Sequence, residues 1–221
     1  MTNDVQILNN GYPMPAVGLG VYKIADEQME EVVRTALDAG YRSFDTAYFY
    51  GNEKALGSAL KQSNIERDEL FITSKLWNDY QGYDQTIEYF NKSLDNLGLD
   101  YLDLFLIHWP CENDQLYIES YKALEHLYEE GKIKAIGVCN FKIQHLEKLM
   151  RETKITPQVN QIELHPYFNQ QDVQDFCDEH DIKVTAWMPL MRNKGLLDDS
   201  VITDIAHRYD KTPAQIVLSL I

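Results

Sequence analysis

Basic residues and cysteines are scarce in this chain of 221 residues. It has 20 Lys and Arg against 35 Asp and Glu, which gives a formal net charge of −15. Nucleic-acid binding requires a dense basic face that contacts phosphates, so this balance argues against a nucleic-acid partner. The three cysteines, Cys111, Cys139 and Cys177, are odd in number and widely separated, which fits neither a disulfide framework nor a zinc site. We therefore expect a reducing, cytoplasmic location.

Long apolar runs are also missing. No stretch approaches the roughly 20 apolar residues that cross a bilayer, and positions 1–10 lack the basic and apolar segments of a secretory signal. We expect no membrane partner. A chain of this length with 44% hydrophobic residues can bury one core. Because no linker or low-complexity stretch interrupts it, we predict a single domain over residues 1–221.

The chain does contain a regular alternation of short apolar runs and segments with helical apolar spacing, which is typical of parallel β/α units. The predicted strands are 16–21, 42–45, 70–76, 102–108, 133–138, 158–164 and 182–187. Gly40, Gly98 and Gly131 stand where a helix would end before the next strand. The turn signal Asn9-Asn10-Gly11 predicts a small hairpin over 5–14, beside the barrel or sheet.

Seven strand–helix pairs leave two architectures open, a doubly wound sheet and a closed barrel. Polar residues distinguish them, because a barrel builds its site from the carboxyl ends of many strands and an open sheet from one switch point. Such residues lie in or directly after several predicted strands: Asp45, Lys75, His108, Gln161 and Glu163 within them, and Asn140 after the fifth. The pattern favours an α/β fold of the (β/α)₈ TIM-barrel type with an N-terminal hairpin.

In such a barrel Asp45, Lys75 and His108 would converge, with Tyr50 one short loop beyond Asp45. Each residue alone has an ordinary structural explanation, but the set together indicates chemistry. We expect the lysine ammonium to lower the pKa of Tyr50 towards neutral pH, and Asp45 to keep the lysine charged. His108 would orient a substrate oxygen. Proton donation to an oxygen, without metal ligands or a nucleophile, indicates carbonyl reduction with hydride from a nicotinamide cofactor.

The segment GYRSFDTA at 40–47, followed by Tyr50, Asn52 and Glu53, resembles the signature of the aldo-keto reductase family. The resemblance continues through ITSKLW at 72–77, DLFLIHWP at 103–110, GVCNF at 137–141 and NQIELHP at 160–166, and covers essentially the whole chain. It is similar to the prokaryotic 2,5-diketo-gluconate and glyoxal reductases within that family. The resemblance implies a catalytic tetrad of Asp45, Tyr50, Lys75 and His108, in which Tyr50 rather than Tyr48 protonates the carbonyl oxygen.

The resemblance also implies where ligands lie. NADPH, with NADH left open, would contact Gly20, Val21, Asp45, Asn140, Gln161, Trp187, Pro189 and Leu190, under a loop at 190–197. An aldehyde or ketone would lie against Tyr22, Trp77, His108 and Trp109. The complete protein is expected to be a monomer.

The chain departs from the family pattern after a helix that Thr212 and Pro213 would begin. The eighth strand, and the Lys-Ser pair and Arg that bind the cofactor's 2′-phosphate in the family, do not follow. We therefore expect a barrel that lacks its eighth strand and is incomplete at the C-terminus, with Ile216, Val217 and Leu220 exposed.

Two other functions stay open. A catalytically silent binding or structural protein on the same barrel would not oxidise a nicotinamide cofactor with an aldehyde. A metal-dependent barrel hydrolase needs clustered ligands such as paired histidines, whereas the histidines here are dispersed. We expect no metal, and metal analysis would decide.

Overall fold

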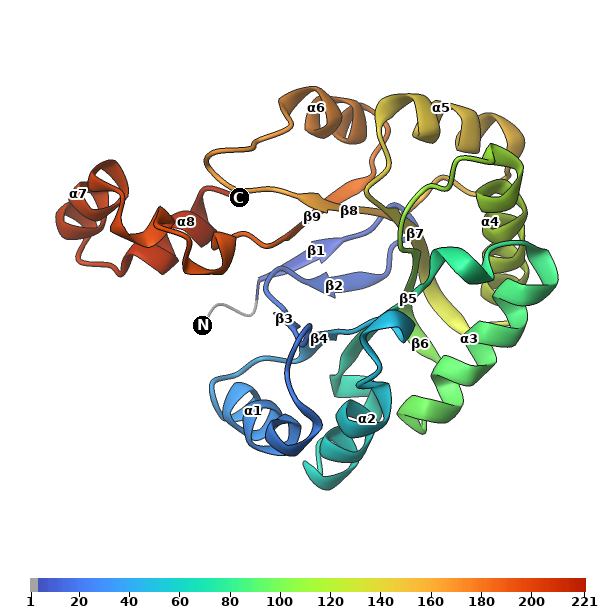
Figure 1. Cartoon of the computed structure of the whole chain (residues 1–221), viewed down its shortest axis with the longest axis horizontal. Coiled ribbons are helices and arrows are strands. Elements are labelled where there is room, and N and C mark those ends of the chain that lie inside the picture. The colour runs from blue at the N-terminus through green and yellow to red at the C-terminus, as the bar shows by residue number, and fades with distance from the viewer. Residues whose placement is uncertain (1–3) are drawn as a thin grey trace.

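The computed structural model describes residues 4–221, apart from the side chain of residue 193. One sheet of seven parallel strands curves into a nearly closed barrel (Figure 1). Its strands, in spatial order, are β3 (Leu19–Gly20), β4 (Ser43–Asp45), β5 (Phe71–Leu76), β6 (Leu102–Ile107), β7 (Ile133–Cys139), β8 (Val159–Glu163) and β9 (Lys183–Trp187). The predicted α/β barrel is confirmed, with β3 and β9 as the two edges of the sheet.

One helix follows each of the strands from β3 to β8 and packs on the outside of the barrel (Figure 1). These helices are α1 (Asp26–Asp38), α2 (Glu53–Gln62), α3 (Tyr83–Leu97), α4 (Asp114–Glu129), α5 (Ile143–Glu152) and α6 (Gln171–Glu179). Gly40, Gly98 and Gly131 follow α1, α3 and α4 with positive φ angles, as the sequence predicted. No helix of the described part is both long and apolar enough to cross a bilayer.

The first strand is shorter than predicted. Of the range 16–21, only Leu19–Gly20 pairs with β4. The backbone N–H of Ala16 donates to the carbonyl oxygen of Asp4 at 2.9 Å, so the start of this range belongs to the hairpin instead.

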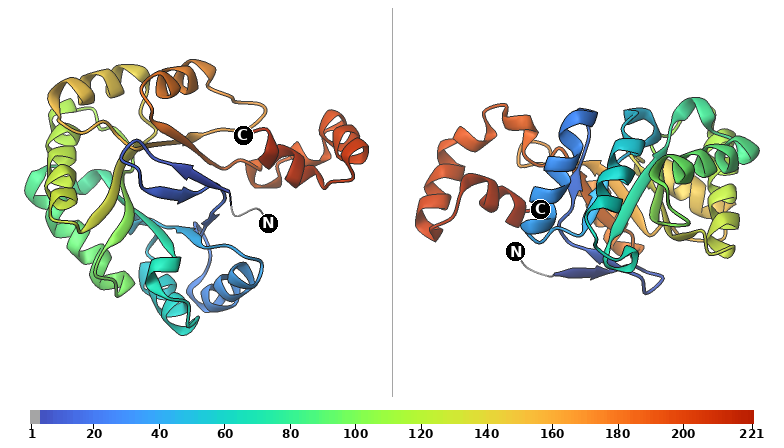
Figure 2. Two further views of the ribbon diagram at one scale, coloured as in Figure 1. Left: turned by 180° about the vertical axis from the view of Figure 1, so that it is seen from behind. Right: turned by 90° about the horizontal axis from the view of Figure 1, so that it is seen from below.

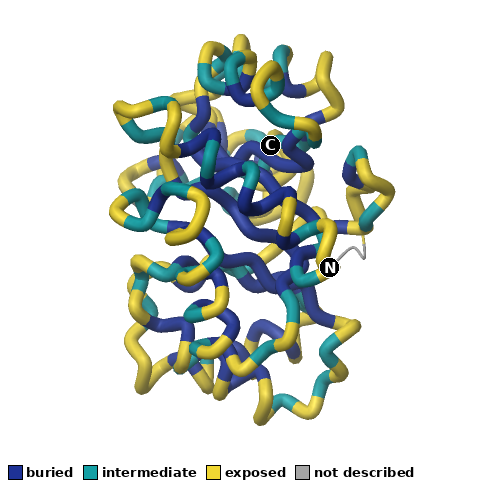
Figure 3. Tube along the Cα trace, turned by 90° about the vertical axis from the view of Figure 1, so that its right-hand side faces the viewer, coloured by how far each residue is buried: buried dark blue, intermediate teal, exposed yellow. Residues whose placement is uncertain are grey.

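The core has two layers, which alternate along each strand because successive side chains point to opposite faces. On β6, Leu104 and Leu106 pack inside the barrel, while Phe105 and Ile107 pack outwards against the helices. The central strands β5 and β6 are accordingly buried along their whole length, in the deeply buried middle of the chain (Figure 3). The edge strand β9, in contrast, is only half-buried along its whole length.

The hairpin lies across the amino-terminal end of the barrel rather than beside it, which corrects the prediction (Figure 2). It pairs β1 (Val5–Ile7) with β2 (Pro13–Pro15). Side-chain amides of its turn donate to carbonyl oxygens at the start of the strands: Asn9 to Pro157 and Asp181, and Asn10 to Lys134. Leu8 and Met14 fill the barrel interior from below. The opposite, carboxyl end is left open.

After β9 the chain forms α7 (Ser200–Tyr209) and α8 (Pro213–Ser219), which project sideways from the barrel (Figures 1 and 2). Thr212 caps α8 and Pro213 opens it, as predicted. The expected exposure of Ile216 and Val217 is wrong, because both are buried against α7 and a turn at Leu196–Asp198. Leu220 is exposed, as predicted.

Gly57 sets the distance between α2 and α3. A Cβ atom at this position would lie 2.2 Å from the carbonyl oxygen of Leu97. Although alanine favours a helix, Gly57→Ala must push the two helices apart, so we expect it to lower the free energy of unfolding by about 1–3 kcal/mol. Thermal unfolding would measure this, with the exposed neighbour Ser58→Ala as the control. Equal unfolding temperatures for the two variants would contradict the close contact.

Candidate active site

The carboxyl ends of three adjacent strands bring the predicted carboxylate, ammonium and imidazole groups together. Asp45 is the last residue of β4, Lys75 lies in β5, and His108 directly follows β6. Tyr50 ends a short 3₁₀ turn, Tyr48–Tyr50, that follows β4. All four side chains therefore converge at the open, carboxyl end of the barrel, as the sequence pattern predicted.

Lys75 is the centre of this group. Its side chain is fully buried, and its ammonium forms an ion pair with the Asp45 carboxylate and donates to the carbonyl oxygen of Thr46 at 2.9 Å. Burial lowers the pKa of Lys75, but the charge of Asp45 and the neighbouring Tyr50 raise it more in sum. The lysine is thus held as an ammonium ion at neutral pH, as predicted.

Tyr50 packs between charged and aromatic groups. The Nζ atom of Lys75 lies 5.2 Å from its ring centroid, and the rings of Tyr22 and His108 lie at 4.7 and 5.6 Å. Burial raises the pKa of Tyr50 more than Lys75 lowers it, and Asp45 raises it further. The prediction of a lowered pKa is therefore wrong for this structure. Tyr50 keeps its proton at neutral pH and has a cation beside it.

His108 is neutral. Burial, and the charge of Lys75 after it, lowers the pKa of the imidazole to about 3. Its Nδ1 atom is buried without a hydrogen-bond partner among the described residues. A neutral imidazole still carries one N–H, so His108 can donate to a ligand oxygen without adding a second positive charge.

Tyr48 belongs to a different cluster. Its ring contacts those of Tyr80 and Tyr89 edge-on, at 5.5 and 5.0 Å. It does not approach Lys75 in the way that Tyr50 does, which agrees with the choice of Tyr50 from the sequence.

An aromatic wall stands beside the group. The Trp77 ring lies 5.3 Å from that of His108 and stacks on Phe49 at 3.8 Å. Trp109 and Tyr22 are also exposed at this end. Phe49 was missed by the sequence reasoning, since it lies between two tyrosines in a turn and carries no motif signal. At 52% exposure it is a stacked aromatic ring that faces solvent.

Two side-chain amides lie on the other side of Asp45. Gln161 of β8 donates through Nε2 to Asp45 at 2.9 Å. Asn140, which follows β7, donates to the carbonyl oxygen of His108 at 3.0 Å and accepts from the Trp187 indole N–H at 2.8 Å. Cys139 is buried beside both amides and is a free thiol. The result is a patch of amides and one flat ring next to the ion pair.

The remaining predicted cofactor residues border this patch. Gly20 ends β3 and has open space where a Cβ atom would lie, while the N–H of Val21 donates to the carbonyl oxygen of Asp45 at 2.9 Å. Pro189 and Leu190 follow β9 and are half-buried. Beyond them the predicted 190–197 loop contains two 3₁₀ turns, with Gly195 at a φ of 84°.

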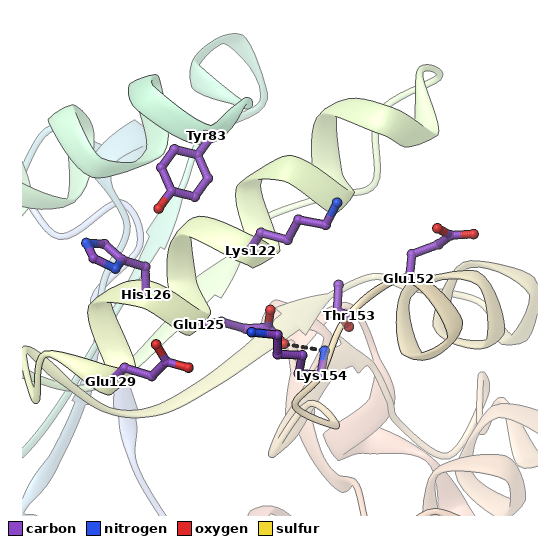
Figure 4. Close-up of a pocket in the computed structure, with 8 residues that line it drawn as sticks. All are labelled: Tyr83, Lys122, Glu125, His126, Glu129, Glu152, Thr153 and Lys154. Carbon is purple, nitrogen blue, oxygen red and sulfur yellow. Dashed lines mark hydrogen bonds between the residues drawn. The ribbon is translucent and has the colours of Figure 1, made fainter.

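The hollows detected on the outer surface are unrelated to this group. One of about 280 Å³ lies between α3, α4 and α5 (Figure 4). Glu125, the buried one of its three acidic residues, already accepts from the backbone N–H groups of Lys154 and Ile155, at 2.6 and 2.7 Å. Over residues 4–221, no three His, Cys, Asp or Glu side chains are grouped so that they could hold a metal ion.

Comparison with known proteins agrees with this geometry. The model of the aldo/keto reductase family matches residues 16–218. This chain belongs to the aldo/keto reductase family. It is 48% identical over 216 residues to glyoxal reductase of Bacillus subtilis (strain 168), with 97% of this chain and 77% of the relative covered. It is 47% identical over 212 residues to methylglyoxal reductase DkgA of Escherichia coli (strain K12), with 96% and 76% covered.

Solved structures of aldo/keto reductases share the fold. An aldo/keto reductase from Brucella melitensis superposes with a TM-score of 0.93 at 46% identity, covering 98% of this chain and 83% of that one. A mutant of Gox0644 solved in complex with NADPH superposes with a TM-score of 0.92 at 42% identity, covering 98% and 78%.

Proposed function

We propose that this protein reduces aldehydes or ketones to alcohols with NADPH, using Asp45, Tyr50, Lys75 and His108. The observation that carries the proposal is the convergence of the four side chains at one end of the barrel, with Lys75 buried between Asp45 and Tyr50. A silent binding protein is one of the two other functions that the sequence left open. Such a protein would not need a buried ammonium beside a protonated phenol.

Tyr50 is the proposed proton donor. Its raised pKa keeps the phenol protonated, and the phenolate that forms on donation lies beside the Lys75 ammonium, which stabilises the negative charge. Asp45 holds that ammonium in place. His108, as the neutral ring, donates a hydrogen bond that orients the carbonyl oxygen towards Tyr50.

The residues beside Asp45 fit a nicotinamide ring. Its carboxamide is neutral and needs both donors and acceptors, which the amides of Asn140 and Gln161 supply. Trp187 offers a flat face, and Gly20 leaves space for the ring at the edge of β3. We propose that these four residues, with Val21, Asp45, Pro189 and Leu190, hold NADPH, whose nicotinamide supplies the hydride when it is bound. NADH remains the alternative cofactor.

The substrate would lie between Tyr50, His108 and the aromatic wall of Tyr22, Trp77 and Trp109. Two of the similar proteins are named glyoxal reductase and methylglyoxal reductase. We therefore propose small aldehydes that carry a second carbonyl group as substrates.

A direct test mixes the purified protein with NADPH and methylglyoxal and follows the loss of NADPH absorbance. We expect oxidation that depends on the aldehyde, and slower oxidation with NADH. A folded protein that binds NADPH but never oxidises it would support the silent alternative. A bound metal ion found by elemental analysis, in a protein that does not oxidise NADPH, would support the metal-dependent hydrolase.

Phe49 offers a test of the aromatic wall. Phe49→Ala removes the ring that stacks on Trp77, so we expect the KM for methylglyoxal to rise by about 3- to 10-fold, equivalent to ~1 kcal/mol. The control is Phe176→Ala on α6, which removes a ring stacked on His180 at 4.2 Å on the outside of the barrel. If both variants left KM unchanged, Trp77 would not line the substrate pocket.

The remaining features of the proposal concern the whole protein. We propose a single aldo-keto reductase barrel domain over residues 1–221. We also propose that the enzyme is a cytoplasmic monomer whose partners are small molecules, with no nucleic acid or membrane among them. The net charge of −15 supports the absence of a nucleic-acid partner.

A further inference from the structure

Asn52 stands where asparagine usually caps a helix, yet it caps nothing. It is the residue before α2, and its side chain makes no capping hydrogen bond. A side-chain cap stabilises the start of a helix, and that contribution is missing here. The side chain is instead buried, with 4% of the residue exposed.

Both halves of the Asn52 amide bond to other segments. Its oxygen accepts from the Thr46 hydroxyl at 2.8 Å, and its nitrogen donates to the carbonyl oxygen of Val21 at 2.8 Å. Thr46 and Val21 are themselves fully buried. Without the amide, the Thr46 hydroxyl and the Val21 carbonyl would lose these buried partners, and a buried polar group without a partner is unfavourable.

The two partners belong to segments that surround Tyr50. Thr46 supplies the carbonyl oxygen that accepts from Lys75 at 2.9 Å. Val21 directly precedes Tyr22, whose ring lies 4.7 Å from that of Tyr50. Asn52 is itself two residues beyond Tyr50. The buried amide of Asn52 therefore joins three segments. They are the one at Thr46, which binds Lys75, the one at Val21, which precedes Tyr22, and the end of the turn that carries Tyr50.

We infer that Asn52 is a positioning residue, which holds the Tyr50 phenol against the Lys75 ammonium. The inference rests on the proposed role of Tyr50 as proton donor. Without the amide, the Thr46 turn loses a fixed partner, and the carbonyl oxygen that places the Nζ atom of Lys75 moves with it. The lysine then lowers the pKa of Tyr50 less, so that pKa rises and proton donation slows.

A buried amide at the other end of the barrel provides a matched control. Gln158 is 1% exposed, accepts from the N–H of Ile136 at 2.7 Å, and donates to Asn9 and to the carbonyl oxygen of Thr156, both at 3.0 Å. It joins the hairpin to the strands, away from Tyr50. Gln158→Ala thus removes the same kind of bonds without touching the proposed site.

The experiment compares Asn52→Ala and Gln158→Ala in thermal unfolding and in methylglyoxal reduction over a range of pH. We expect both to unfold at lower temperature, and only Asn52→Ala to lower kcat, by about 10²-fold, and to move the alkaline limb of the kcat profile to higher pH. Thr46→Val, which removes the hydroxyl but keeps the backbone carbonyl, should move kcat and the limb in the same direction by less, and it serves if Asn52→Ala does not fold.

A second readout does not depend on activity. Spectroscopic titration of tyrosine ionisation, taken as the difference between each protein and its Tyr50→Phe counterpart, isolates Tyr50 among the 14 tyrosines. We expect a higher pKa of Tyr50 in Asn52→Ala and an unchanged one in Gln158→Ala. If Asn52→Ala and Thr46→Val kept the wild-type kcat profile and Tyr50 titration, the inference would be wrong. An active Tyr50→Phe enzyme would instead refute the proton donor, which is a separate failure.

Discussion

Tyr50→Phe should reduce kcat for methylglyoxal reduction by about 10²–10⁴-fold, the usual contribution of a positioned general acid. The variant loses only the phenolic oxygen and its proton, and the ring can keep its contacts with Tyr22 and His108. The proposed cofactor residues lie at the carboxyl ends of β3, β4, β7, β8 and β9 and do not include Tyr50, so NADPH affinity should stay nearly unchanged. Steady-state kinetics and an NADPH titration by Trp fluorescence would measure the two quantities.

Tyr48→Phe is the matched control, because it removes the same atom two residues earlier. Its ring packs with Tyr80 and Tyr89 instead of Lys75, so kcat should change little. Equal losses in the two variants would mean that the turn at 48–50 matters as a structural unit, and Tyr50 would not be the acid. Retention of most of the rate by Tyr50→Phe would exclude the assignment outright.

The sequence predicted the fold well because the signals for it are local and repeated. Alternating apolar periods, with glycines after the helices, define parallel β/α units without knowledge of long-range contacts. The convergence of Asp45, Lys75 and His108 then follows from the topology alone, since a barrel turns the carboxyl ends of all its strands towards one opening. Residues far apart in sequence could therefore be grouped before any distance was known.

The features that were missed depend on tertiary contacts. The hairpin signal fixes a turn, but only the bonds from Asn9 and Asn10 to the strand starts place it across the barrel. Ile216 and Val217 are buried because a neighbouring helix and turn cover them, which apolar spacing cannot specify. Asn52 was identified from the sequence only as part of the family signature, and its side-chain bonds run to residues 6 and 31 positions away.

The direction of the Tyr50 pKa shift shows the same limit in energetic terms. The sequence led us to expect that Lys75 lowers the pKa of Tyr50, and in the structure the charge of Lys75 does act in that direction. Burial acts in the opposite direction and is larger, and the Asp45 charge next to the lysine partly cancels its field. The motif residues show which groups interact. Whether the pKa of Tyr50 rises or falls in total depends on how deeply each group is buried, which the sequence does not specify.

Lys75→Met should slow the reaction and move its alkaline limit upwards. Lys75 is the largest of the effects that lower the pKa of Tyr50, so its loss leaves burial and Asp45 to raise that pKa further. Tyr50 donates a proton only when it is protonated, so activity is present below its pKa and is lost as pH rises through it. An opposite charge at about 4–6 Å shifts a pKa by about one to three units, so the alkaline limb should move up by about one to three pH units. A less stable phenolate also makes a poorer product of proton transfer, so kcat at neutral pH should fall about 10-fold or more.

The measurement is kcat against pH, with circular dichroism to establish that the variant folds. Lys92→Met is the control, since this exposed lysine also lies over a tyrosine ring, that of Tyr89 at 3.9 Å, but outside the site. A Lys75→Met enzyme with the same alkaline limb as Lys92→Met would show that the ammonium does not act on the proton donor, even if its kcat were low.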